Sequence, residues 1–308
     1  VLHAIHSSAC RYKRHIIPLL SMSIDFYVRV FVRVEKSKLN VKSRASLTSL
    51  VYQSLGCDAF HLQPMGTIDK SKRNWKYNQA TGPPCDTRCK FTGSRHKVLG
   101  PTWSGPLHDA EFVEKVLMHV KKNPGKYGTE KRITGQLTVC KAELPNPLYY
   151  VLDYLSKTFH TNFKIIHLRS AIINAGYKVS QSHSEKNAIK TDAPPEVIMD
   201  IMKQIVELNP EIGKAKRGPE TPAGKIIAQP IVTKADFKLA KGAEGIHHAF
   251  FPNPEENWGP KSRAVGYGPS GKRQTLQEKS KQNQGKRKKR KLEKEAARAN
   301  ANAENKTQ

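Results

Sequence analysis

The sequence predicts a chain of class α/β, in which the end of one α/β domain precedes an α+β domain. Three observations lead to this prediction. The opening run "VLHAIHSSACRYKRHI" spaces its apolar residues as a helix does. Residues 23–36 then alternate along a β-branched and aromatic run, which is typical of a strand. A helix that leads into a strand suits the last part of an α/β domain, and from residue 128 to residue 208 short helical patterns surround one strand.

The first hundred residues predict few regular elements beyond these two. The opening helix is expected to run to about Ile16, where Pro18 stops it. Residues 36–50 are polar and basic and predict a loop or hinge. The run "LVYQSLGCDAFHLQPMG" has strand character, whereas residues 66–84 are loop-like. No start or cap signal precedes Val1, so we expect the chain to be the C-terminal part of a longer protein.

The next hundred residues are dominated by helical patterns. Asp109 is a plausible N-cap for a helix that Pro124 ends. Thr129 is a possible cap of a second helix, and Pro147 suits the first turn of a third. The pattern "KIIHLRSAIINAG" predicts a further helix that ends at Gly176.

A short strand, a polar loop and a last helix complete this region. The strand is expected in "YKVSQSH", the loop in "SEKNAIKTDAP" and the helix in "PPEVIMDIMKQIVELNP", with Asp192 as its cap. Three helices, a strand and a polar loop are the outline of a winged-helix unit, whose third helix and wing face nucleic acid. Residues 209–264 predict an irregular extension, and residues 265–308 a disordered basic tail.

The charge of the chain points to a polyanionic partner. The formal net charge is +27, and the basic excess extends into the body as well as the tail. RNA, DNA or an acidic membrane surface would each attract such a chain, and a solvated surface is the plainer alternative. No run approaches the roughly 18 apolar residues of a membrane span. The segment "KRKKRK" at 286–291 reads as a nuclear or nucleolar signal, or else as part of a solvated tail.

Two cysteines stand close together in "PPCDTRCKFTGSRH". Zinc prefers four nitrogen or sulfur ligands, which usually come as two close pairs, and Cys85 with Cys89 forms one such pair. Five unevenly placed cysteines do not make a disulfide framework, which favours a reducing intracellular compartment. Cys10 and Cys140 fall on predicted helices and read as core thiols.

Four segments together resemble one known family. They are "RYKRHIIPLLSMSIDFYVRVFVRV", "GPLHDAEFV", "SHSEKNAIKTDAP" and "NPEENWGPKSRA". In this order they resemble the eukaryotic and archaeal tRNA (guanine-N2)-dimethyltransferases, which modify the guanine between the D-stem and the anticodon stem. The region "CDTRCKFTGSRH" looks closer to the vertebrate "like" paralogue of that enzyme.

The resemblance implies a division of the chain. Residues 1–36 would be the end of a Rossmann-like domain that binds S-adenosylmethionine, residues 37–100 a linker and zinc-binding segment, and residues 101–208 the winged-helix-like RNA-binding region. The methyl-donor and catalytic motifs of the family would lie upstream of Val1, so no catalytic or cofactor-binding residue is assigned in this chain, and this part alone is not expected to methylate. A non-catalytic RNA-binding paralogue is the alternative, and a DNA-binding winged helix is a weaker one.

The resemblance also supplies the other half of the metal site. The family usually carries a Cys-x-x-Cys where this chain reads "SLGC", so that Cys57 matches the second cysteine and Ser54 stands at the first. The ligand set would then be Cys57, Cys85, Cys89 and either His61 or His96. The alternative is a site that has decayed and packs its thiols without metal.

Two groups of residues are candidates for RNA contact. The first lies in the third helix, the strand and the loop of the winged-helix-like region, and comprises Arg169, Lys178, His183, Lys186, Asn187 and Lys190. The second combines phosphate neutralisation with base stacking, and comprises Lys72, Arg73 and Trp75. The plainer alternatives are a structural turn for the first group and a solvated loop for the second.

Overall fold

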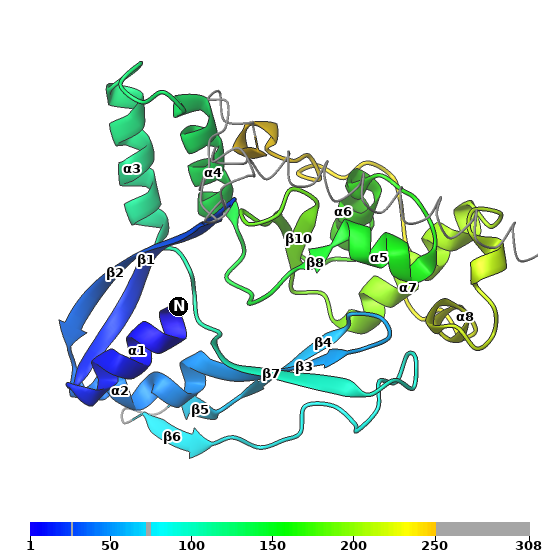
Figure 1. Cartoon of the computed structure of the whole chain (residues 1–308), viewed down its shortest axis with the longest axis horizontal. Coiled ribbons are helices and arrows are strands. Elements are labelled where there is room, and N and C mark those ends of the chain that lie inside the picture. The colour runs from blue at the N-terminus through cyan, green and yellow to red at the C-terminus, as the bar shows by residue number, and fades with distance from the viewer. Residues whose placement is uncertain (26, 72–74, 251–308) are drawn as a thin grey trace, which may run out of the picture. The chain divides into compact units, whose positions relative to one another are not determined.

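The chain begins with a helix that is followed directly by an antiparallel β-hairpin (Figure 1). Helix α1 covers Leu2–Arg11, and strands β1 (Arg14–Ile24) and β2 (Tyr27–Lys36) pair along their whole length. This computed structural model describes residues 1–25, 27–71 and 75–250. The predictions for Lys72, Arg73, the basic tail and "KRKKRK" therefore lie outside the described residues.

The predicted end of the first helix is wrong, and the first strand was not predicted. Helix α1 ends at Arg11, and Pro18 lies inside β1, where the register shifts between Pro18 and Leu20. Pro18 faces Val32 of β2, and Leu19 is the residue that the bulge leaves unpaired; each strand of a two-stranded sheet has a free edge, where a residue without an N–H is tolerated. The strand predicted over residues 23–36 is confirmed from Tyr27 to Lys36 as β2, whereas Ser23 and Ile24 belong to β1.

A three-stranded antiparallel sheet follows, with the order β4-β3-β7. The prediction of a loop over residues 36–50 is wrong, because this stretch forms two short helices and the start of β3; residues 66–84 likewise contain a small hairpin. The elements are α2 (Lys38–Lys42), η1 (Ser43–Leu47), β3 (Thr48–Ser54), β4 (Phe60–Pro64), β5 (Gly66–Asp69), β6 (Lys76–Gln79) and β7 (His96–Trp103). The strand character of residues 50–66 is confirmed.

Helices α3 (Ala110–Lys122) and α4 (Glu130–Ala142) form an antiparallel pair. The predicted cap of α3 is confirmed, because Asp109 Oδ1 accepts a hydrogen bond from the Phe112 N–H at 2.9 Å. Thr129 is the N-cap residue of α4 as predicted, but its side chain accepts no capping hydrogen bond. Leu20 of β1 packs into the core between the two helices, which ties the hairpin to this pair.

The remaining region alternates helices with short strands in the order β8, α5, α6, β9, β10, α7. Their bounds are Tyr150–Val151, Leu152–Phe159, Ile165–Asn174, Val179–Gln181, Ala188–Thr191 and Pro195–Leu208. The three strands form an antiparallel sheet of order β8-β10-β9. The helix ending near Gly176, the strand β9 and the helix α7 are confirmed as predicted.

Three local predictions in this region are wrong. Pro147 does not begin a helix, since α5 starts at Leu152 after a short strand. The segment "SEKNAIKTDAP" contains β10 and is not only a loop. Asp192 does not cap α7 but accepts a hydrogen bond from the Lys178 N–H at 2.8 Å, which holds the two ends of the β9–β10 hairpin together.

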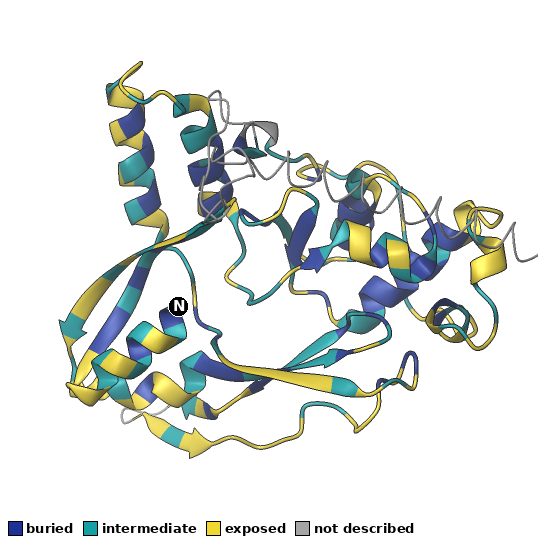
Figure 2. Cartoon of the chain, viewed as in Figure 1, coloured by how far each residue is buried: buried dark blue, intermediate teal, exposed yellow. Residues whose placement is uncertain are grey.

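The main core surrounds α7, from which nine residues are buried (Figure 2). Residues 209–250 run over its surface with the short elements η2 (Lys214–Lys216), α8 (Pro222–Ile227) and η3 (His247–Phe250). Asp200 of α7 anchors this extension, because its Oδ2 accepts hydrogen bonds from the N–H groups of Val232 and Thr233. Among the described helices, none is both long and apolar enough to cross a membrane.

Candidate functional site

The cysteines and histidines that were predicted as metal ligands lie in two neighbouring groups, the pair Cys57 and Cys89 and the group His61, Cys85 and His96. Cys57 follows β3 and Cys89 precedes β7, and their Sγ atoms lie 3.6 Å apart in the interior. With Zn–S bonds of about 2.3 Å, a tetrahedral zinc ion separates two sulfurs by roughly 3.8 Å. The distance in this pair is therefore close to that of two ligands on one zinc ion.

A second group lies beside this pair. Ligand atoms of His61, Cys85 and His96 all lie within 4.8 Å of one another. Strand β3 explains the approach of the two histidines, since His61 pairs with Tyr52 and His96 with Ser54. Positions two residues apart on a strand share a face of the sheet. The sequence left a choice between His61 and His96, and the structure places both next to Cys85.

His96 supplies an independent reason to consider a ligand here. Both of its ring nitrogens are buried and have no hydrogen-bond partner. A buried polar group without a partner is costly, so such groups are usually satisfied by an ion or water where protein atoms are absent. Burial lowers the pKa of His61, which favours the neutral imidazole that binds metals. The residues present therefore fit a zinc ion chemically.

The pKa values of the two thiols are shifted in opposite directions. The hydrogen bond between the two thiols lowers the pKa of Cys89, and the same bond together with burial raises the pKa of Cys57. Ser54 is buried beside them and accepts a hydrogen bond from the Gly56 N–H at 3.2 Å. The serine at the position where the family resemblance implies a thiol therefore packs against the pair instead of leaving a gap.

A separate buried cluster surrounds Glu143, the residue after α4. Its side chain is fully buried, with Oε2 at 3.2 Å from His108 Nε2 and 2.5 Å from His183 Nδ1, and Oε1 at 3.0 Å from Lys190 Nζ. Burial by itself raises the pKa of Glu143, but the two histidine hydrogen bonds and the charge of Lys190 outweigh it and lower the pKa. The carboxylate is therefore ionised and paired.

This cluster is satisfied by protein groups. The Ser21 N–H donates to His108 Nδ1 at 3.4 Å, so the proton of that imidazole lies on Nε2 and points at Glu143. Cys140 is close enough to complete a set of possible metal ligands. Both carboxylate oxygens are already paired, Oε1 with the Lys190 ammonium and Oε2 with the two histidines, so the arrangement is that of a buried ion pair with two histidine donors.

Two predicted RNA-contact residues belong to the Glu143 cluster. Lys190 and His183 are 3 % and 6 % exposed, whereas the sequence placed both on a solvent-facing strand and loop. The reason is that β10 lies in the middle of its sheet and turns Lys190 toward Glu143, which no local pattern reveals. Their predicted contact with RNA from an exposed loop does not agree with these positions.

The other predicted RNA-contact residues differ in their exposure. Lys178 and Lys186 are exposed at the two ends of the β9–β10 hairpin, and Asn187 is half-buried beside them. Arg169 is buried in α6. Trp75 is exposed before β6, with Lys70 Nζ 4.7 Å from its ring centre, which leaves that aromatic face partly occupied by a cation.

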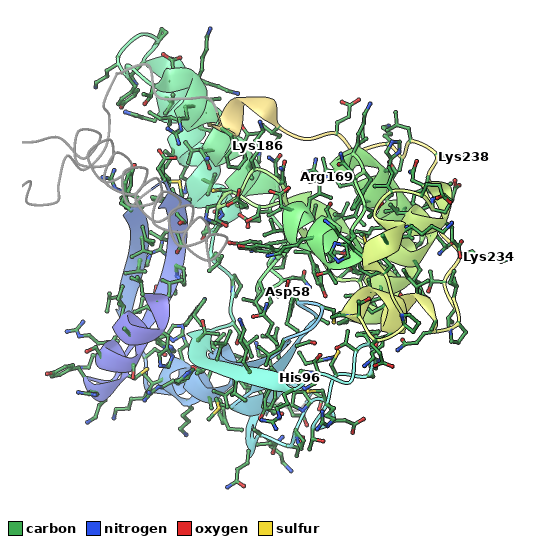
Figure 3. The ribbon with its side chains drawn as sticks, turned by 45° about the vertical axis from the view of Figure 1, so that its right-hand side comes forward. Asp58, His96, Arg169, Lys186, Lys234 and Lys238 are labelled. Carbon is green, nitrogen blue, oxygen red and sulfur yellow. The ribbon has the colours of Figure 1, made fainter. Side chains whose placement is uncertain are left out.

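The sequence did not predict a role for two exposed lysines that follow α8. Lys234 and Lys238 lie on the extension, and Figure 3 shows both on the loop that runs past the helices. Asn174 at the end of α6 donates to the carbonyl oxygens of Asp236 and Lys238, each at 2.9 Å, which places Lys238 beside α6. The segment has no regular pattern, so the lysines repeated at 234, 238 and 241 were the only feature of the sequence that could have indicated an RNA contact here.

Comparison with known proteins gives consistent relatives. The family model described as "N2,N2-dimethylguanosine tRNA methyltransferase" matches residues 1–203. The chain is 44 % identical over 298 residues to the tRNA (guanine(26)-N(2))-dimethyltransferase of Mus musculus, covering 92 % of this chain and 44 % of the relative. It is 41 % identical to dimethyltransferase 1 of Arabidopsis thaliana, covering 86 % and 45 %.

A solved structure shares the fold. It is Trm1 from Pyrococcus horikoshii, determined with S-adenosyl-L-methionine, with a TM-score of 0.50 at 22 % identity, covering 65 % of this chain and 47 % of that one. The chain thus spans about half the length of the relatives that it matches.

Proposed function

The chain belongs to the N2,N2-dimethylguanosine tRNA methyltransferase family, and we propose that it is the C-terminal, tRNA-binding part of such an enzyme. The observation that carries the proposal is the topology of the region from α4 to β10. Helix, strand, two helices and two strands follow one another, and the sheet order is β8-β10-β9. This order is that of a winged-helix unit, in which α6 is the third helix and the β9–β10 hairpin is the wing.

The proposed tRNA surface uses the exposed cations around that unit. Lys178 and Lys186 lie on the wing, and Lys234 and Lys238 lie on the extension, the latter beside α6. Each cation that neutralises a phosphate releases counterions, so a surface of this kind binds RNA with a strong salt dependence. The net charge of +27 supports a polyanionic partner.

The first hairpin supports the placement of residues 1–36 at the end of a methyltransferase domain. Strand β2 exposes Val28, Phe31 and Val34, which are 56 %, 43 % and 46 % exposed. Val28 and Val34 share one face of the strand and Phe31 lies on the other, and exposed apolar side chains of this size often mark a surface that another layer covers. Upstream residues of the complete protein would supply that layer, together with the site for S-adenosylmethionine.

The chemistry of the complete enzyme is a direct methyl transfer. The exocyclic N2 atom of guanine attacks the methyl carbon, the bond from that carbon to the sulfonium sulfur breaks, and the N2 atom loses a proton. S-adenosylmethionine supplies the electrophilic methyl group when it is bound. We assign none of the described residues to cofactor binding, so the role of this chain is to bind and orient the tRNA.

Zinc is proposed as a structural cofactor. Cys57, Cys89 and Cys85 would supply sulfur ligands and His96 a nitrogen ligand, with His61 as the competing nitrogen. The buried, unpartnered nitrogens of His96 support this assignment. A closed site with four protein ligands stabilises a fold and takes no part in a reaction.

Nuclear localisation is a further proposal. It rests only on the basic composition of residues 286–291, "KRKKRK".

The proposed function is tested by separating binding from catalysis. Filter binding of an unmodified tRNA transcript and of duplex DNA, at one salt concentration, should show the chain preferring tRNA. Transfer of labelled methyl groups to that tRNA should be absent for the 308-residue chain and present when the complete protein is used. Methylation by the 308-residue chain would contradict the assignment. Binding without methylation by the complete protein would favour a non-catalytic paralogue, the alternative that the serine at position 54 supports.

A further inference from the structure

A cavity of about 400 Å³ opens at the first turn of α6. Three segments form its walls: α6 itself, the β9–β10 hairpin, and the extension from residue 243 to residue 250. The polar groups on these walls include Arg169, Gln181 and Lys186, and the apolar ones include Ile166, Ile246 and Phe250. The volume falls in the range of small-molecule sites, roughly 300–1,000 Å³.

Arg169 is the unusual member of this cavity. The residue is 5 % exposed, its Nε atom is buried without a hydrogen-bond partner, and its Nη1 reaches only the Ala243 carbonyl oxygen at 3.5 Å. Among the described residues, no carboxylate forms an ion pair with it. Burial lowers the pKa of Arg169, yet a guanidinium stays protonated in proteins. A buried, unpaired cation that lines a cavity indicates an anionic ligand, because leaving it unpaired costs free energy.

The surroundings of Arg169 favour a phosphate as that anion. The first turn of α6 presents the positive end of a ten-residue helix to the same cavity, through Ile165 and Ile166. Lys186 stands exposed at the edge of the cavity and adds a second cation. Figure 3 shows Arg169 and Lys186 as residues of neighbouring segments, the helix and the hairpin.

The rest of the cavity is suited to a nucleobase. Ile166, Ile246 and Phe250 offer an apolar surface against which a planar ring can pack. Gln181 already holds the wall in place, because its Oε1 accepts a hydrogen bond from the Ile246 N–H at 2.8 Å. The cavity therefore combines a cationic end with an apolar side, which is the division of charge found in a nucleotide.

We propose that this cavity binds one nucleotide of the tRNA, with its phosphate at Arg169 and Lys186 and its base against Ile166, Ile246 and Phe250. The proposal rests on the proposed tRNA-binding function and gives it a defined subsite. The extension contributes one wall, so residues 243–250 are part of the RNA-binding unit. Glu244 also borders the cavity, and its carboxylate opposes a phosphate ligand.

The first test compares Arg169→Met with Glu244→Gln in the 308-residue chain. Loss of one charged hydrogen bond to phosphate should weaken binding of a tRNA transcript about 10- to 100-fold and reduce the salt slope by about 0.7–0.9. The melting temperature should stay constant or rise, since the variant removes an unpaired buried charge. Glu244→Gln should bind tRNA more tightly. Lys157→Met, an exposed lysine of α5 outside the cavity, is the matched control and should differ little.

Two further measurements keep the proposal falsifiable. A Cβ atom at residue 245 would lie 2.7 Å from Arg169 Nη1, so Gly245→Ala crowds the cavity while keeping the charge. Weakened tRNA binding by this variant, at an unchanged melting temperature, supports the subsite even if Arg169→Met fails to fold. Wild-type affinity in both the Arg169→Met and Gly245→Ala variants overturns the subsite but leaves the proposed function standing. Failure of the unmodified chain to bind tRNA overturns both.

Nucleoside 5′-monophosphates and inorganic phosphate test the phosphate-binding and base-binding parts of the cavity separately. The monophosphates should raise the melting temperature of the wild-type chain and not that of Arg169→Met. Inorganic phosphate at the same concentration should raise it less, because it lacks the base. Equal effects of the two would overturn the base-binding part of the proposal, and no effect of either on the wild type would overturn the phosphate site.

Discussion

Glu143 and Lys190 form a buried ion pair, with Lys190 Nζ 3.0 Å from Glu143 Oε1 and neither side chain more than 3 % exposed. The pair joins the end of α4 to the central strand of the β8-β10-β9 sheet. His108 donates to the same carboxylate from the segment before α3, and its other nitrogen accepts from Ser21 of β1. One carboxylate thus links the first hairpin to the β8-β10-β9 sheet.

Replacement of this carboxylate should be strongly destabilising. Glu143→Gln leaves Lys190 buried without its counter-charge, and removal of one partner from a buried pair costs about 3–5 kcal/mol. Chemical unfolding by urea at neutral pH measures the change. Glu220→Gln is the control, because Glu220 pairs with Lys225 at 3.1 Å while 92 % exposed, and exposed pairs contribute about 0–1 kcal/mol. Equal stabilities of the two variants would contradict the role given to Glu143.

A buried histidine pair predicts a loss of stability in mild acid. His6 Nε2 lies 3.2 Å from His15 Nδ1, and burial followed by the charge of His15 lowers the pKa of His6 to about 4. Between about pH 6.5 and pH 4 the unfolded chain binds a proton there that the folded chain does not, so stability falls as the pH falls. The slope should reach up to about 1.4 kcal/mol per pH unit.

The measurement is the free energy of unfolding at a series of pH values. His6→Gln should flatten the slope in this window, whereas His119→Gln, at the last turn of α3 and away from the pair, should leave it unchanged. The Glu143 carboxyl acts in the same direction at lower pH, because its lowered pKa contributes stability above about pH 4 that is lost as the pH falls further. An unaltered slope in His6→Gln would rule out the histidine pair as the cause.

The sequence predicted those parts of the fold that depend on neighbouring residues. Asp109 caps α3 because the side chain and the N–H that it binds lie three residues apart. The approach of Cys57 to Cys89 was predicted from a family resemblance and not from spacing alone. Pro18 predicted the end of the first helix, but a proline is also tolerated in an edge strand, and only its pairing with Val32 of β2 shows that it lies in β1.

The parts that could not be predicted depend on partners far away in the chain. The sequence around Lys190 is typical of a surface lysine, and only the structure shows that Lys190 pairs with Glu143. Arg169 reads as a surface residue of a recognition helix until the extension around Ala243 covers it. Neither contact has a local signature, because side-chain burial in a strand or helix is set by what packs against that face.

The exposed lysines should contribute to tRNA affinity without selecting among sequences. Lys234→Ala combined with Lys238→Ala removes two phosphate-binding charges, so the salt slope should fall by roughly 1.4–1.8 and the affinity at low salt should fall for every RNA alike. Filter binding across salt concentrations measures both quantities. Lys157→Ala serves as the control for general loss of charge. An affinity that changes while the salt slope stays the same would place these lysines away from the phosphates.

Removal of metal should destabilise the chain if the cysteine–histidine cluster holds zinc. Metal analysis of the purified chain should find about one zinc per chain, since the three sulfurs and one imidazole complete a single tetrahedral site. Chelation should lower the melting temperature, because binding to the folded state alone adds to its stability. Cys89→Ser should lose both the metal and the stability, whereas Cys10→Ser, whose thiol lies on α1, should keep both.

His96→Gln distinguishes the two histidines, because it abolishes zinc binding only if His96 is the fourth ligand. A Cys57→Ser variant that keeps its zinc and its melting temperature would exclude the proposed ligand set.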